Sequence, residues 1–131
     1  MRYLLDTHAL LWASTGADEL PQSVGDAIID PANDIFVSIA SFWEISIKAS
    51  LGKLPLTGST GAFQARTESM NIVTLPISLQ ALDTIRSLPF YHKDPFDRII
   101  MATAIVEDLT LITIDLAIAA YPVAQWWGDE I

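Results

Sequence analysis

Four acidic residues in this 131-residue chain lie beside apolar segments, where a carboxylate without a compensating charge is costly. They are Asp6 after residues 3–5, Glu44 within 39–51, Asp97 before 99–102 and Asp115 after 109–114. One shared cation would compensate these charges. The donors are oxygen atoms and the chain has no cysteine, so Mg²⁺ or Mn²⁺ fits better than Zn²⁺. Such an ion activates water and stabilises charge on a phosphoryl oxygen, which predicts a metal-dependent enzyme.

Three of these carboxylates also have a simpler structural explanation as helix-start residues. Asp6 and Asp115 are suitable N-caps for helices that begin at the next residue. Asp94 is a suitable N-cap followed by Pro95 at N1, which places Asp97 at N3, where the helix dipole favours a negative charge. Taken singly, each of these three carboxylates is explained better by capping than by a metal site, so the prediction depends on their combination.

Glu44 has no capping role because it lies in the middle of its helical segment. It falls at the edge of the apolar stripe made by Ala40, Trp43, Ile47 and Leu51. Its structural alternative is a surface pair with Lys48, four residues on, worth a few tenths of a kcal/mol. The stripe predicts that Trp43 belongs to the core.

Strand-like and helix-like segments alternate along the chain. The predicted strands are 2–5, 35–37, 72–75, 111–114 and 123–126, and the predicted helices are 7–14, 21–30, 39–51, 62–69, 78–88, 94–108 and 116–120. This alternation predicts an α/β fold with a largely parallel sheet, in a single domain spanning residues 1–131.

The predicted sheet explains how distant carboxylates would meet. Residues that follow the strands of a parallel sheet gather along one edge, where ligands bind. Asp6 and Asp115 occupy such positions, whereas Glu44 and Asp97 reach this edge only if their helices lean over it. The sequence therefore predicts that the four side chains converge.

Composition limits the classes of function that the chain can have. The net charge of −9 argues, taken alone, against a nucleic-acid binder, although several of the few basic residues flank the carboxylates. Asp94 and Arg98 are four apart and form an alternative helix pair. The absence of cysteine excludes disulfides and suits a reducing cytoplasm. We see no membrane span and no signal peptide, so we expect a cytoplasmic protein.

Several stretches spread along the whole chain carry a family resemblance. They read LLDTHALLW at 4–12, SIASFWEISIK at 38–48, LGKLPL at 51–56, HKDPFDR at 92–98 and LITID at 111–115. In these stretches the chain resembles the PIN-domain family, specifically the VapC-type toxins of bacterial and archaeal toxin–antitoxin pairs.

The resemblance implies a three-layer α/β/α domain with a five-stranded parallel sheet of order 3-2-1-4-5. It implies an endoribonuclease that depends on Mg²⁺ or Mn²⁺, forms a homodimer and is inhibited by a cognate antitoxin. The family's site positions match Asp6, Glu44, Asp97 and Asp115, and Thr113 matches the usual Thr or Ser. We expect Asp6 and Asp97 to coordinate the metal directly, and Glu44 and Asp115 to hold its waters or a second ion, so that metal-activated water cleaves RNA.

The basic residues near the predicted site are candidates for RNA contacts. Lys48, Lys93 and Arg98 lie close in sequence to Glu44 and Asp97 and are predicted to contact phosphates. The alternative is that they are solvated surface charges.

Two other functions stay open. One is a catalytically silent PIN-like module that only binds protein or RNA; the complete set of carboxylates argues against it. The other is a Mg²⁺-dependent phosphohydrolase acting on small molecules, which would need an aspartate where the chain has His8. We expect His8 to pack rather than bind metal. Trp12, Trp126 and Trp127 are candidates for the core, an antitoxin groove or base stacking.

Overall fold

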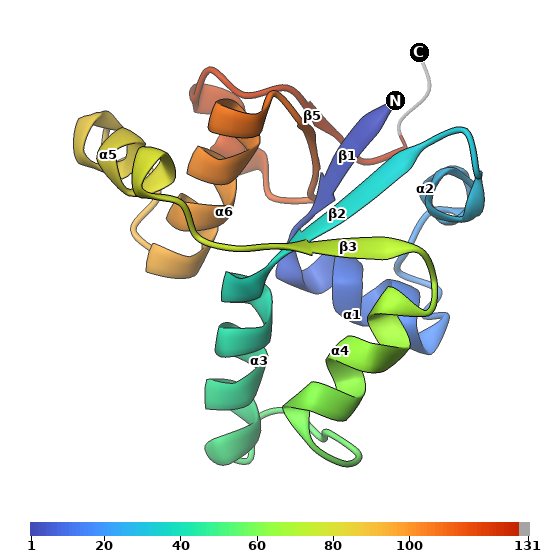
Figure 1. Cartoon of the computed structure of the whole chain (residues 1–131). Helices are drawn as coiled ribbons and strands as arrows, with labels where there is room; N and C mark the ends of the chain where they lie inside the picture. The colour runs from blue at the N-terminus through green and yellow to red at the C-terminus, as the bar shows by residue number, and fades with distance from the viewer. Residues whose placement is uncertain (129–131) are drawn as a thin grey trace.

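A parallel sheet forms the centre of the protein. The structure, a computed structural model, describes residues 1–128. Its strands are β1 (Arg2–Leu5), β2 (Asp34–Ser38), β3 (Ile72–Leu75), β4 (Thr110–Ile112) and β5 (Gln125–Trp126). They lie in the order β3-β2-β1-β4-β5, and every pairing is parallel (Figure 1). The predicted sheet order is therefore confirmed.

Helices connect the strands and cover the sheet. They are α1 (Thr7–Thr15), α2 (Gln22–Ile29), α3 (Ile39–Ser50), α4 (Thr60–Glu68), α5 (Leu79–Ser87), α6 (Pro95–Glu107) and the short 3₁₀ helix η1 (Leu116–Ala120). Their starts follow from the sequence, because Ser38, Ser59 and Ser78 cap α3, α4 and α5 with their side-chain oxygens. None of the helices in residues 1–128 is long and apolar enough to cross a membrane.

The alternation of side chains along the strands creates two cores. Tyr3 and Leu5 point to one face of the sheet, where buried side chains of α1, α2 and α4 pack on them. Leu4 and Leu111 point to the other face, which α5 and α6 cover. Each fully buried leucine contributes about 1.5–3 kcal/mol to the burial free energy. This arrangement confirms the predicted three-layer α/β/α architecture (Figure 1).

Helix α3 buries a different face from the one that its apolar stripe predicted. Trp43 is 57% exposed and meets Phe96 edge-on, whereas Glu44 is only 5% exposed. Placing Trp43 in the core was therefore wrong. The reason is that α3 buries Ser41, Phe42 and Ile45, and polar partners make burial of the intervening Glu44 acceptable.

Candidate metal centre

Two of the predicted carboxylates are fixed by helices that begin at the end of a strand. Asp6 follows β1 and accepts the Ala9 N–H at 2.8 Å, which caps α1. Asp115 comes shortly after β4 and accepts the Ala117 N–H at 2.9 Å through Oδ1, which caps η1. The capping explanation is thus correct for both. Capping is compatible with metal binding, because it holds each carboxylate at the carboxyl edge of the sheet.

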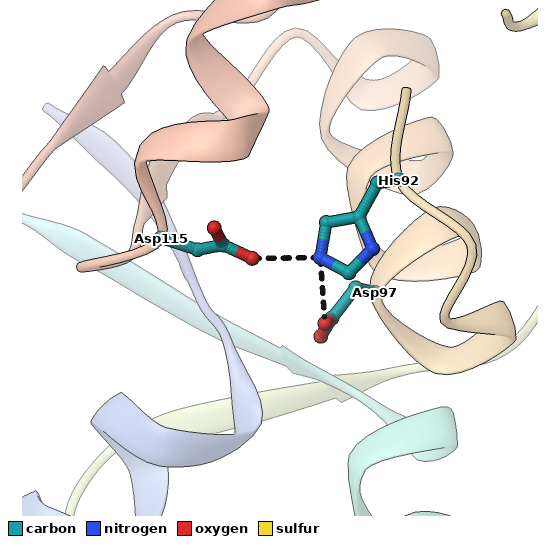
Figure 2. Close-up of side chains that lie close together, drawn as sticks. All are labelled: His92, Asp97 and Asp115. Carbon is teal, nitrogen blue, oxygen red and sulfur yellow. Dashed lines mark hydrogen bonds and ion pairs between the residues drawn. The ribbon is translucent and has the colours of Figure 1, made fainter. Parts of the chain in front are cut away.

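His92 lies between two carboxylates at this edge (Figure 2). Its Nε2 atom is 2.6 Å from Asp115 Oδ2 and 3.1 Å from Asp97 Oδ2. The Asp94 N–H points at the His92 Nδ1 atom, 3.2 Å away. Nδ1 is therefore the acceptor, and the neutral ring carries its hydrogen on Nε2 and donates it toward the carboxylates. One ligand atom from each of His92, Asp97 and Asp115 lies within 4.8 Å of the others.

Asp97 is in an unfavourable electrostatic position for a charged carboxylate. Burial, together with the neighbouring charge of Asp94, raises the pKa of Asp97 to about 7. His92 opposes this shift, whereas the charges of Glu44 and Asp6 add to it. The negative charge collected here exceeds what the surrounding protein compensates, and a cation would relieve the excess.

Asp6 is also buried, and its burial raises the pKa of its carboxyl group. The hydrogen bond from Thr113 and that from the Ala9 backbone act in the opposite direction. Thr113 is itself fixed, because its Oγ1 atom accepts the Asp115 N–H at 3.1 Å. Thr113 thus links Asp6 to the segment that carries Asp115.

Glu44 is buried with both of its oxygens engaged. Oε1 accepts the Thr7 hydroxyl at 2.7 Å, and Oε2 lies 2.8 Å from Lys48 Nζ. The hydrogen bond to Glu44 raises the pKa of Lys48. The predicted Glu44–Lys48 pair therefore exists, but its acidic member lies inside the protein, facing α1.

The structure brings the predicted acidic residues to one end of the sheet. Two of them lie close to each other, and the other two lie farther away. Asp97 and Asp115 meet at His92 within 4.8 Å, whereas Asp6 and Glu44 act on Asp97 through their charges. Carboxylate oxygens without a thiolate are a donor set that fits Mg²⁺ or Mn²⁺, and His92 orients two of these carboxylates through its Nε2 hydrogen. His92 is the residue that sequence reasoning missed. Its position two residues before Asp94, the cap of α6, was the available signal.

The predicted RNA contact at Arg98 is wrong. Its side chain is 3% exposed, and its guanidinium donates to the carbonyl oxygens of residues 85, 88, 89 and 92. None of the ion pairs among residues 1–128 joins Arg98 to Asp94, so the alternative pairing is wrong as well. Lys93 is exposed and Lys48 is half-buried, so both remain accessible from solvent.

The other three tryptophans lie on the α1 side of the sheet. Trp126 stacks on Tyr3 with ring centroids 5.4 Å apart, and Trp127 lies 5.7 Å from Trp12. Both Trp126 and Trp127 pack against the core on that face. His8 is exposed, and its ring lies 5.4 Å from the Trp12 ring.

Comparison with known proteins identifies the family to which this fold and this acidic edge belong. A family model described as PIN domain matches residues 3–123. The chain belongs to the PIN domain family. Ribonuclease VapC22 of Mycobacterium tuberculosis is 30% identical over 129 residues, which cover 94% of this chain and 97% of the relative.

Solved structures share this fold. A chain of VapBC2 from Rickettsia felis, bound to a DNA fragment from its promoter, superposes with a TM-score of 0.70 at 18% identity and covers 96% of this chain and 98% of its own. A chain of VapBC-1 from nontypeable Haemophilus influenzae gives a TM-score of 0.66 at 19% identity, with 98% of each chain covered. The resemblance seen in the sequence motifs is confirmed.

Proposed function

We propose that this PIN domain protein is an endoribonuclease that depends on Mg²⁺ or Mn²⁺ and is the toxin of a toxin–antitoxin pair. The observation that carries the proposal is the convergence of Asp97 and Asp115 at His92, beside buried Asp6, at the carboxyl edge of a parallel sheet. The similarity to Ribonuclease VapC22 and to chains of VapBC complexes supports RNA as substrate and an antitoxin as partner. We place this single-domain protein in the cytoplasm.

The residues have separate roles in this proposal. Asp6 and Asp97 would hold the ion directly, and Glu44 and Asp115 would hold its waters or a second ion. Thr113 holds Asp6 through the hydrogen bond that opposes the rise in the pKa of Asp6. His92 keeps the Asp97 and Asp115 carboxylates facing each other. A divalent ion supplies an activated water and compensates charge on the scissile phosphate.

Metal removal tests the proposed function. Single-stranded RNA incubated with the protein should be cut with Mg²⁺ or Mn²⁺ present and should stay intact with EDTA, because the site's carboxylates cannot activate water without a cation. The measurement is gel analysis of an end-labelled RNA.

Parallel arms separate the competing functions. Calorimetric binding of Mn²⁺ without RNA cleavage would indicate a silent binding module. Turnover of a generic phosphate monoester without RNA cleavage would indicate a small-molecule phosphohydrolase. Cleavage that persists in EDTA would contradict metal dependence.

The proposed homodimer needs an exposed apolar face, and α3, α5 and α6 provide one. Trp43, Leu82 and Phe96 line an apolar groove between these helices, with almost no polar surface. Leu79 and Leu82 of α5 are 78% and 44% exposed. Patches of this kind mark protein contacts, and a second copy would cover this one.

The dimer proposal is tested by Trp43→Glu, which places a charge in this face. The expected result is a shift from dimer to monomer in sedimentation velocity, because an unpaired charge is costly in an apolar interface. Val73→Glu is the matched control, since Val73 is 53% exposed on β3, away from this groove. A Trp43→Glu protein that stays dimeric would show that the copies meet elsewhere.

A further inference from the structure

A groove on the α1 side of the molecule concentrates positive charge in an acidic protein. It has a volume of about 520 Å³ and lies between α1, α4 and the segment that joins α3 to α4. Lys48, Lys53 and Arg66 line it, which is three of the seven Lys and Arg residues of a chain with net charge −9. None of the residues that line it is acidic. The groove is therefore a local cationic surface.

Two of these cations are available to a ligand. Lys53 and Arg66 are exposed, and neither takes part in an ion pair among residues 1–128. The Arg66 guanidinium lies 5.8 Å from the Phe63 ring and donates to the Thr57 carbonyl at 3.4 Å, which keeps it beside the groove. Lys48 differs, because its ammonium group is engaged by Glu44.

The groove also carries aromatic and apolar surface. Trp12 and His8 form part of its wall, with their rings 5.4 Å apart. Leu54 and Leu56 add aliphatic surface to the same lining. Flat aromatic rings next to cations are the combination on which bases of a single strand stack while its phosphates meet the charges.

Two residues of the groove lie next to residues of the candidate metal centre. Lys48 lines the groove and contacts buried Glu44 at 2.8 Å. His8 lines the groove and follows buried Asp6 by two residues, in the first turn of α1. A chain lying in the groove would thus lead directly to the acidic edge.

From this juxtaposition we infer that the groove binds a single-stranded segment of the RNA substrate next to the scissile phosphate, with Lys53 and Arg66 at phosphates and Trp12 at a base. This inference rests on the proposed function and extends it. It explains how an acidic protein holds a polyanion: the carboxylates face the cation, and the groove supplies the positive charge that the rest of the surface lacks.

The test is the binding of a fluorescein-labelled single-stranded RNA, followed by anisotropy in EDTA so that no cleavage occurs. In the double variant Lys53→Ala, Arg66→Ala the affinity should fall roughly tenfold at low salt. The slope of log affinity against log salt should fall by about 1.4, because each phosphate contact to a single strand contributes about 0.7. Arg86→Ala is the matched control, since Arg86 is an exposed cation on α5, outside the groove.

A second probe tests the base contact without altering the protein. An abasic strand of equal length and charge should bind roughly tenfold more weakly than the RNA, because stacking of a base on an aromatic side chain is worth about 1–3 kcal/mol. Equal affinity for the two strands would overturn the stacking at Trp12.

The outcomes distinguish this inference from the proposed function. Unchanged RNA affinity and an unchanged salt slope in the double variant would overturn RNA binding in the groove, even where the parent protein cleaves RNA with Mg²⁺. A loss of self-association in the double variant, with RNA affinity retained, would make the groove an interface between copies and would also overturn it. Loss of RNA affinity would support the groove even where the parent protein fails to cleave RNA.

Discussion

Asp97→Asn should abolish RNA cleavage and at the same time stabilise the metal-free protein at pH 8. Cleavage should fall by roughly three orders of magnitude, because a carboxylate that holds the cation supports several kcal/mol of transition-state stabilisation. The gain in stability follows from burial and from the charge of Asp94, which raise the pKa of Asp97 to about 7. Cleavage of a labelled RNA and urea denaturation in EDTA measure the two effects.

The pH dependence of this gain has a definite sign. The pKa of Asp97 is about 7 in the folded protein, above the ordinary value of 3.8. The folded state therefore binds the extra proton, and this contribution to stability is lost as the pH rises from about 4 through 7. Asparagine has no proton to lose, so the advantage of Asp97→Asn should be absent near pH 4 and reach roughly 1–3 kcal/mol at pH 8.

Metal addition provides the complementary measurement. Mn²⁺ should raise the melting temperature of the parent protein more at pH 8 than at pH 5.5, and should have little effect on Asp97→Asn. Asp83→Asn is the control, because Asp83 is an exposed carboxylate on α5 and should change neither activity nor metal response. Full cleavage by Asp97→Asn with Mg²⁺ present would remove Asp97 from the site.

Arg98→Met should lower the free energy of unfolding by about 3–5 kcal/mol, because it leaves buried polar groups without their partner. Arg98 Nη1 donates to the Pro89 carbonyl at 2.8 Å, and Nη2 donates to the Ile85 carbonyl at 3.1 Å. The guanidinium also lies 4.2 Å from the Phe90 ring. Urea denaturation measures the loss.

A matched variant separates the role of Arg98 from the general loss of a charge. Arg86→Met removes an exposed arginine from α5 and should change stability by less than about 0.5 kcal/mol. Arg98→Lys should recover only part of the stability, since one ammonium group cannot replace the planar guanidinium group, whose N–H donors reach several carbonyls. A fully stable Arg98→Met protein would show that these carbonyls need no internal donor.

Much of the fold could be predicted because local and tertiary signals agree. Strand β1 carries alternating buried residues, with Leu4 on one face and Leu5 on the other, and the strands alternate with capped helices. The positions of Asp6 and Asp115 at strand ends were predictable for the same reason. Helix capping and metal binding both require a carboxylate at the end of a strand, so neither explanation excluded the other.

The errors arose where the partner of a side chain lies outside its own helix. Arg98 was assigned to RNA because it follows Asp97, but the carbonyls that bind it belong to the connection between α5 and α6. Helical periodicity predicts Trp43 in the core, but the hydroxyl of Thr7 on α1 binds Glu44 and makes that residue the buried neighbour. No local pattern shows which carbonyls or hydroxyls a fold will bring to a side chain.

The helix caps at Asp6 and Asp115 have a consequence for the choice of ion. Each carboxylate already commits one oxygen to a backbone amide, which disfavours binding a cation through both of its oxygens at once. Ca²⁺ prefers six to eight oxygen ligands, often with two from one carboxylate, whereas Mg²⁺ retains several of its waters and accepts single-oxygen ligands. The edge is therefore suited to a small, well-hydrated ion, and Ca²⁺ should compete poorly there.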